Sequence, residues 1–204
     1  MTENLTSKDA VRAHYGQPGE LARRKQLAAL DQHARAFIAL SPFLVIASAD
    51  AAGRADATPR GDAPGFVAVM DNSTLLIPDR RGNNRVDTML NIAENPHVGL
   101  LFLVPGIDET LRVNGTAWIT TDVSRLAPLA AQGKTPAAGL LVRIEEVFFH
   151  CGKALIRSQL WDVERQVERR SFPTLGRIIA DQIAGADPRT CEQAIEESYR
   201  DRLY

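Results

Sequence analysis

The chain of 204 residues contains little cysteine: it has only Cys151 and Cys191. They lie far apart and outside the spacing of cysteine metal sites, so the sequence indicates neither a disulfide scaffold nor a bound metal, and a reducing cytoplasm is the expected location. Cys151 follows His150 directly. Because neighbours on a strand point to opposite faces, we expect a buried cysteine there rather than a Cys–His nucleophile pair.

Long apolar runs and an excess of charge of one sign are also lacking. The longest apolar runs, such as 98–105, reach about eight residues, whereas a membrane-spanning helix needs about 20. Residues 1–9 are polar, with no apolar core of a signal peptide. The net charge is −1, which argues against a nucleic-acid or membrane partner. The ordinary share of apolar and charged residues predicts a globular protein.

Several catalytic motifs are absent. No G-x-G-x-x-G indicates a dinucleotide-binding site, and no G-x-S-x-G indicates a serine hydrolase. Gly133-Lys134-Thr135 resembles the end of a phosphate-binding Walker A loop, but Pro128 replaces the earlier glycine. We therefore expect a surface loop there. The four histidines form no H-x-x-x-H pair, which disfavours a zinc hydrolase.

The pattern of elements indicates a protein that is mainly β with flanking helices. Six or seven short strands, separated by turn residues and few helices, favour an antiparallel barrel over a parallel sheet. We expect one domain over 1–204, with helical extensions at 1–40 and 172–204. The predicted strands are 43–48, 54–58, 65–70, 74–77, 97–104, 111–121 and 139–149, with a possible last strand at 154–159. The predicted helices are 20–40, 85–93, 122–131, 174–184 and 189–199.

Arginine is abundant: 20 of the 24 basic residues are Arg and 4 are Lys. Codon bias explains most of them, but Arg80, Arg81 and Arg85 fall together between a predicted strand and a helix, with no acidic residue among them. Such a turn directs backbone N–H groups and guanidinium groups at one place, which suits a phosphate. Two further basic clusters surround Arg60 and the segment 153–161.

In order along the chain, four segments resemble the pyridoxamine 5′-phosphate oxidase-like flavoproteins. The segment 75–85 is a strand followed by a basic turn, and 90–102 is a helix, an Asn-Pro stop and an apolar strand. The segment 111–117 is similar to the R-V-x-G-x-A strand of the family. The segment 150–161 is similar to the signature of an uncharacterised FMN-binding branch, and the likeness covers about 37–161.

This resemblance implies a split β-barrel that forms a homodimer and holds FMN in two equivalent clefts at the interface. It places the FMN phosphate at Arg60, Asn84 and Arg85, with Arg81 and Asn83 nearby. The strand that contains Pro78 and Asp79 would lie along the flavin ring. The other subunit would contribute Arg112, or a neighbour of it, and the region of Arg157, Ser158 and Trp161.

The resemblance implies an FMN-dependent oxidoreductase acting on a small substrate. The R-x-H substrate motif of the oxidase is absent from 186–204, and Asn83-Asn84-Arg85 replaces its S-R-K type turn. Oxidation of pyridoxamine phosphate is therefore not the expected reaction. Arg60 or Arg157 could instead stabilise the reduced ring, and no catalytic residue is assigned. Two alternatives remain: a non-enzymatic flavin carrier or redox sensor, and a split barrel that binds haem or a deazaflavin.

Overall fold

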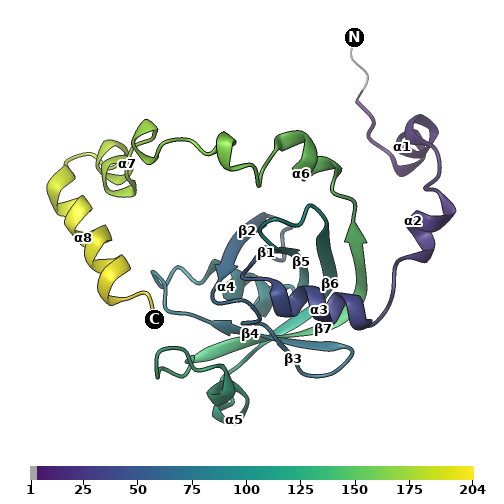
Figure 1. Cartoon of the computed structure of the whole chain (residues 1–204), viewed down its shortest axis with the longest axis horizontal. Helices are drawn as coiled ribbons and strands as arrows, with labels where there is room; N and C mark the ends of the chain where they lie inside the picture. The colour runs from purple at the N-terminus through teal and green to yellow at the C-terminus, as the bar shows by residue number, and fades with distance from the viewer. Residues whose placement is uncertain (1–3) are drawn as a thin grey trace.

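A computed structural model describes residues 4–204, and its centre is one curved sheet of seven antiparallel strands (Figure 1). The strand order is β2-β1-β5-β6-β7-β4-β3, so β2 and β3 are the edges and the sheet stays open. This arrangement confirms the predicted split barrel. The strands are β1 (Phe43–Ala49), β2 (Ala55–Gly61), β3 (Ala68–Val69), β4 (Thr74–Asp79), β5 (His97–Leu103), β6 (Thr110–Thr120) and β7 (Ala138–His150).

Burial alternates along the strands, which places the core on the inner face of this sheet. In β1, Leu44 and Ile46 are fully buried, and their neighbours along the strand are more exposed. In β5, Leu100 and Phe102 repeat the pattern, as expected for strands with one face on the core. β4 is buried along most of its length, in keeping with its place between β7 and β3. The predicted strand at 65–70 forms only the short β3.

The long β6–β7 pair contains the irregularity expected at Gly115. The register shifts between Asn114 and Gly115, and a Cβ atom on Gly115 would lie 1.9 Å from the carbonyl oxygen of Arg143. No side chain fits at that distance, so glycine is required for the backbones to approach. The bulge adds curvature to the sheet at its middle.

The helical prediction for 20–40 is wrong in its middle. The chain forms α2 (Glu20–Arg24) and α3 (Gln32–Leu40), preceded by α1 (Lys8–Tyr15). Between α2 and α3, Leu27 exchanges backbone hydrogen bonds with Val147 of β7. The Asp31 side chain then accepts a hydrogen bond from the N–H of Ala34 at 2.8 Å and starts α3 anew. Pairing with the sheet therefore overrides the helical pattern.

The possible last strand at 154–159 is also wrong, because the chain turns into α6 (Lys153–Ser158). Gly152 lies close against Asp108, where an added Cβ would be only 2.6 Å from the Asp108 Cβ atom. The first helical hydrogen bond then runs from Ile156 to the Gly152 carbonyl at 2.9 Å. At this turn Cys151 is exposed, contrary to the expected burial. Cys151 has left the sheet, so no strand covers it.

Two helices, α3 and α4 (Asp87–Glu94), pack on the sheet. α3 packs on β7, and α4 packs on β1 and β6. α4 corresponds to the helix predicted at 85–93. A short turn of α5 (Val123–Leu126) and η1 (Ala127–Leu129) links β6 to β7. Asp122 caps α5, as its position in the sequence predicted.

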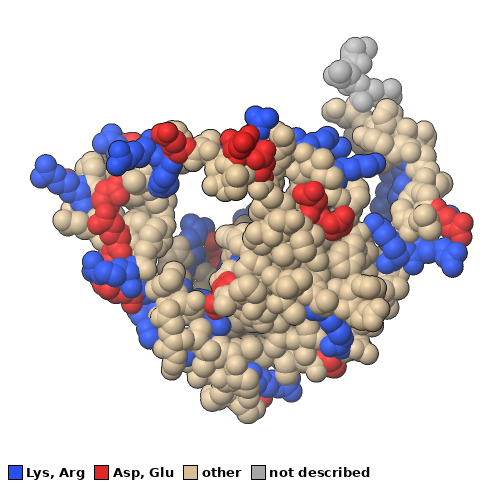
Figure 2. Space-filling view, in the orientation of Figure 1, with Lys and Arg blue, Asp and Glu red and all other residues tan. Residues whose placement is uncertain are grey.

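The segment after β7 forms an arm that runs around the outside of the barrel to the C-terminus (Figure 1). It contains α6, η2 (Val163–Arg165), η3 (Arg169–Ser171), α7 (Leu175–Gln182) and α8 (Pro188–Asp201). α7 and α8 pack on each other, with Gly176 in close contact with the backbone of Glu192. Charged side chains gather along this arm and along the N-terminal helices, while the barrel face toward the viewer is largely uncharged (Figure 2). Within 4–204, every helix is too short or too polar to cross a bilayer.

Candidate functional site

A pocket of about 450 Å³ opens at the end of β4, where Asp79 pairs with Ala138 at the start of β7. It is formed by the end of β2, the loop between β4 and α4, the loop before β7, and the end of the chain. The pocket is lined by Arg60, Asp79, Arg80, Arg81, Gly82, Asn83, Asn84, Val86, Lys134, Thr135, Pro136, Ala137 and Tyr204. The basic turn and the cluster around Arg60, which are separate in the sequence, thus meet in one place.

The charge of the pocket is positive, with Asp79 as its acidic lining residue. The Arg60 Nη2 atom lies 3.9 Å from the Asp79 Oδ1 atom. The Arg60 side chain is 21% exposed and the Asp79 side chain 33% exposed. Burial raises the pKa of Asp79 above its usual value, and the positive charge of Arg60 opposes this rise. Among residues 4–204, Arg81 has no ion-pair partner within 4.0 Å. Its guanidinium group is therefore available to an anion.

The loop from Arg80 to Val86 presents backbone donors to the same space. Asn84 and Val86 have left-handed backbone angles, with φ of +61° and +49°. Within the described chain, the N–H groups of Gly82, Asn83 and Asn84 donate no hydrogen bond. Val86 precedes α4 and provides no side-chain cap to its first turn. Unpaired N–H groups in such a turn, beside a helix start, suit an anion such as phosphate.

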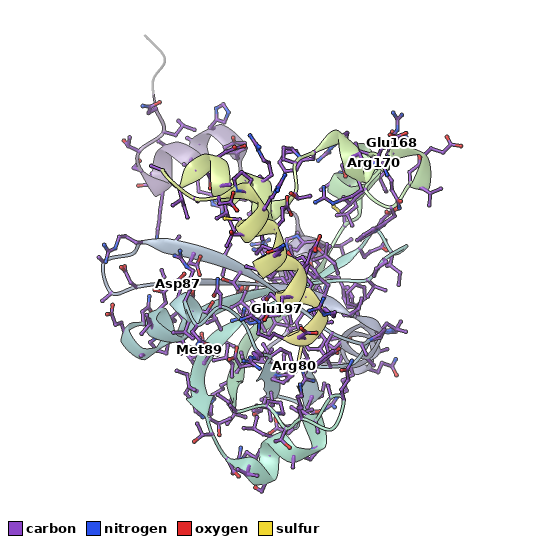
Figure 3. The ribbon with its side chains drawn as sticks, turned by 90° about the vertical axis from the view of Figure 1, so that its left-hand side faces the viewer. Arg80, Asp87, Met89, Glu168, Arg170 and Glu197 are labelled. Atoms are coloured by element: carbon purple, nitrogen blue, oxygen red, sulfur yellow. The ribbon has the colours of Figure 1, made fainter. Side chains whose placement is uncertain are left out.

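Arg80 has a different environment from its neighbour Arg81. Its Nε donates to the Asp62 Oδ2 atom at 2.6 Å, and its Nη1 donates to the Leu129 carbonyl at 2.8 Å. Its guanidinium carbon lies 5.9 Å from the centre of the Tyr204 ring. Figure 3 shows Arg80 at the lower end of α8. Arg80 therefore joins the walls of the pocket, with its charge already compensated by Asp62.

The remaining predicted residues are placed outside the pocket. Pro78 is buried in β4, directly before Asp79. Arg85 does not line the pocket, and its Nε donates to the Asp87 Oδ2 atom at 2.8 Å with three quarters of the side chain exposed. That hydrogen bond raises the pKa of Arg85, so it stays charged. Arg112 lies on β6 with its guanidinium carbon 5.5 Å from the Phe148 ring centre.

The third predicted cluster lies at the opposite end of β7. Arg157 and Ser158 are exposed on α6, and the Trp161 Nε1 atom donates to the Ile107 carbonyl at 2.9 Å. Ala138 and His150 are the two ends of β7, a path of about 40 Å at the usual rise per residue. Within one chain, this cluster and the pocket therefore lie at opposite ends of β7.

Sequence reasoning missed six pocket residues: Val86, Lys134, Thr135, Pro136, Ala137 and Tyr204. The predicted surface loop does contain Lys134, but β4–β7 pairing brings it to the pocket. The Gly-Lys-Thr signal was present in the sequence, although its Walker context was not. Nothing in the sequence near Tyr204 indicates its position, because the path of the whole arm decides it.

Comparison with known proteins identifies the family. Residues 30–151 match the family described as pyridoxamine 5′-phosphate oxidase, so the chain belongs to this family. No curated protein matches the sequence.

Three solved structures that resemble the chain illustrate how far the likeness extends. HupZ of Group A Streptococcus shares 22% identity, covering 59% of this chain and 93% of that one, with a TM-score of 0.49. A candidate pyridoxamine 5′-phosphate oxidase of Lactobacillus delbrueckii shares 25% over 61% and 98%, with a TM-score of 0.48. A protein named F420 reductase shares 15% over 59% and 98%, with a TM-score of 0.44. The family assignment itself rests on residues 30–151.

Proposed function

We propose that this protein is an FMN-dependent oxidoreductase of a small substrate, with the FMN phosphate held in the pocket at the end of β4. The observation that carries the proposal is the meeting of Arg60, Arg81 and the loop of Gly82, Asn83 and Asn84 around one cavity. Two guanidinium groups and unpaired backbone donors match the geometry and charge of a phosphate monoester. Membership of the family supports flavin over other phosphorylated ligands.

The residues of the pocket fit the cofactor in charge and in position. Arg81 has no competing carboxylate among 4–204, and the Arg60–Asp79 contact is long enough to leave Arg60 available. From the phosphate, the strand Ile77-Pro78-Asp79 leads along β4 and would lie beside the flavin ring. Bound FMN supplies the electron-transfer chemistry. The chain itself holds the phosphate, orients the ring and limits access of water.

We further propose that the complete site needs two copies of the chain. Arg112, Arg157, Ser158 and Trp161 are expected at the flavin, yet α6 follows the far end of β7 in the same chain. In a homodimer, the α6 region of each copy would lie at the pocket of the other copy. The residues of α6 could then contact the flavin although they are far from the pocket of their own chain. In that arrangement Arg157 could reach the flavin ring, where a positive charge stabilises the reduced form.

The first experiment is an absorbance spectrum of the purified protein, followed by titration with FMN. Paired bands in the blue and near-ultraviolet that saturate at one FMN per chain are the expected result. A protein that stays colourless after FMN is added refutes the proposal, and a Soret band favours haem instead. Bound FMN that no reduced nicotinamide cofactor reduces at a useful rate favours the flavin carrier or redox sensor.

A matched pair of variants assigns the binding to this pocket. Arg81→Gln removes a cation that faces the cavity, and Arg125→Gln removes an exposed one near Asp122, on the loop between β6 and β7. We expect Arg81→Gln to weaken FMN binding by about tenfold or more, since a hydrogen bond to a charged group contributes about 1.5–3 kcal/mol. Arg125→Gln should bind as the parent does. Equal affinities of the two variants would place FMN elsewhere.

A further inference from the structure

Tyr204 joins the end of the arm to the walls of the pocket by three different contacts. Its hydroxyl group donates to the Asp62 Oδ1 atom at 2.8 Å, and its ring lies over the Arg80 guanidinium group. The Lys134 Nζ atom donates to the backbone oxygen of Tyr204 at 2.9 Å. These partners come from three segments: the end of β2, the end of β4 and the loop before β7. Tyr204 also lines the cavity itself.

Residues 174–203 of the arm contact mainly one another. α7 packs on α8, Thr174 hydrogen-bonds to Glu192, and Arg177 pairs with Asp181. Within the described chain, every hydrogen bond that joins residues 175–204 to the barrel involves Tyr204. At its other end the arm is fixed by the Trp161 hydrogen bond to Ile107. The helices α7 and α8 form a strap between these two anchors, Trp161 and Tyr204.

A strap held in this way can move as one body when its end is released. Over residues 175–204, Ile183, Tyr199 and Leu203 are mostly exposed, so few apolar contacts oppose the movement. A segment with few buried contacts has a low free energy of local opening. The contacts of Tyr204 therefore decide how often the strap leaves the pocket, and hydrogen bonds to charged groups are the stronger ones.

We propose that the α7–α8 strap is a lid on the phosphate pocket and that Tyr204 is its latch. This rests on the proposed function, in which the pocket holds the FMN phosphate. While Tyr204 is bound to Asp62, Arg80 and Lys134, it forms one wall of the pocket and shields the phosphate site from water. Release of Tyr204 removes that wall and opens a path for the cofactor. Tyr204 is thus a positioning residue, which acts through the lid.

The test compares two variants of the latch with a variant of Tyr199, a tyrosine on the helix α8 that precedes Tyr204. Tyr204→Phe removes the hydroxyl group that bonds to Asp62 and keeps the ring over Arg80, whereas Tyr204→Ala removes both. Tyr199→Phe, whose side chain is exposed on α8, is the control. Two quantities are measured on the full chain: the rate of FMN release, from the recovery of flavin fluorescence on dilution, and backbone amide hydrogen exchange without FMN.

We expect FMN release to be about tenfold faster in Tyr204→Ala, which corresponds to about 1.4 kcal/mol, and several-fold faster in Tyr204→Phe. Hydrogen exchange should increase over 188–202 and also in the pocket loop 80–86, while Tyr199→Phe behaves as the parent. Circular dichroism checks that the variants remain folded, and core strands such as β5 should keep their exchange protection.

Each contrary result has a definite meaning. Faster exchange over 188–202 with unchanged FMN release would make Tyr204 a structural anchor only and overturn the lid. Unchanged exchange over 188–202 would overturn the latch. If the parent protein binds no FMN, the proposed function fails. The lid is then judged by exchange in 80–86 alone, and equal exchange there in Tyr204→Ala and the parent would overturn it.

Discussion

Arg60 and Asp79 carry opposite charges in the pocket. Substituting them one at a time should therefore change FMN affinity in opposite directions. Arg60→Gln removes a cation of the pocket, and Asp79→Asn removes the carboxylate that competes for it. The two charges are 3.9 Å apart, so their interaction is about 1 kcal/mol in a water-like medium and about 4 kcal/mol at an effective dielectric constant of 20. Because both side chains are partly exposed, the lower value applies.

From these values we expect Asp79→Asn to tighten FMN binding about fivefold, since Arg60 is freed from about 1 kcal/mol of competition. Arg60→Gln should weaken binding by about tenfold or more, from the loss of a charge-assisted hydrogen bond of about 1.5–3 kcal/mol. Isothermal titration calorimetry with FMN at constant ionic strength measures both. Changes in the same direction would refute the reasoning, because they would mean that the Asp79 carboxylate helps to bind FMN instead of competing for Arg60, or that the pocket has lost its shape.

The remaining predictions concern stability, pH and the second subunit. Gly115→Ala should lower the free energy of unfolding by about 3 kcal/mol or more, since the backbone oxygen of Arg143 leaves no room for a Cβ atom. Urea denaturation measures this against Gly19→Ala, where nothing lies within 4 Å; equal losses would contradict the close approach. Burial raises the pKa of Asp62, but hydrogen bonds from Ala63, Tyr204 and Arg80 lower it by more. The pKa of Asp62 therefore lies below 3.8, the usual value of an aspartate. Its contribution to stability is thus present above pH 3.8 and lost as the pH falls below it. Asp62→Asn should flatten that part of the stability profile, and an unchanged profile would disprove the assignment. Finally, mixing the Arg81→Gln and Arg157→Gln proteins should restore FMN binding in the hybrid dimer, because one of its two sites then carries both arginines; calorimetry that shows no recovery would rule out the shared site.

The order of strands, turns and arginines determined the fold class and half of the candidate site. The apolar runs of β1 and β5, the glycine at 115 and the cap at Asp122 are local signals, and each was readable directly. The basic turn after β4 was also readable, because its charges are close together in sequence. Family likeness depends on the same signals, so residues 30–151 carried it.

Only the tertiary structure decided which of these residues meet. Lys134 and Tyr204 reach the pocket because β4 pairs with β7 and because the arm passes around the barrel. Residues 25–31 leave their helical pattern since Leu27 pairs with β7, and α6 replaces a strand because Gly152 turns the chain against Asp108. Arg80 and Arg81 are adjacent and chemically alike, yet Asp62 compensates one and no carboxylate within the described chain compensates the other. Such differences arise from partners far away in sequence, which local patterns do not encode.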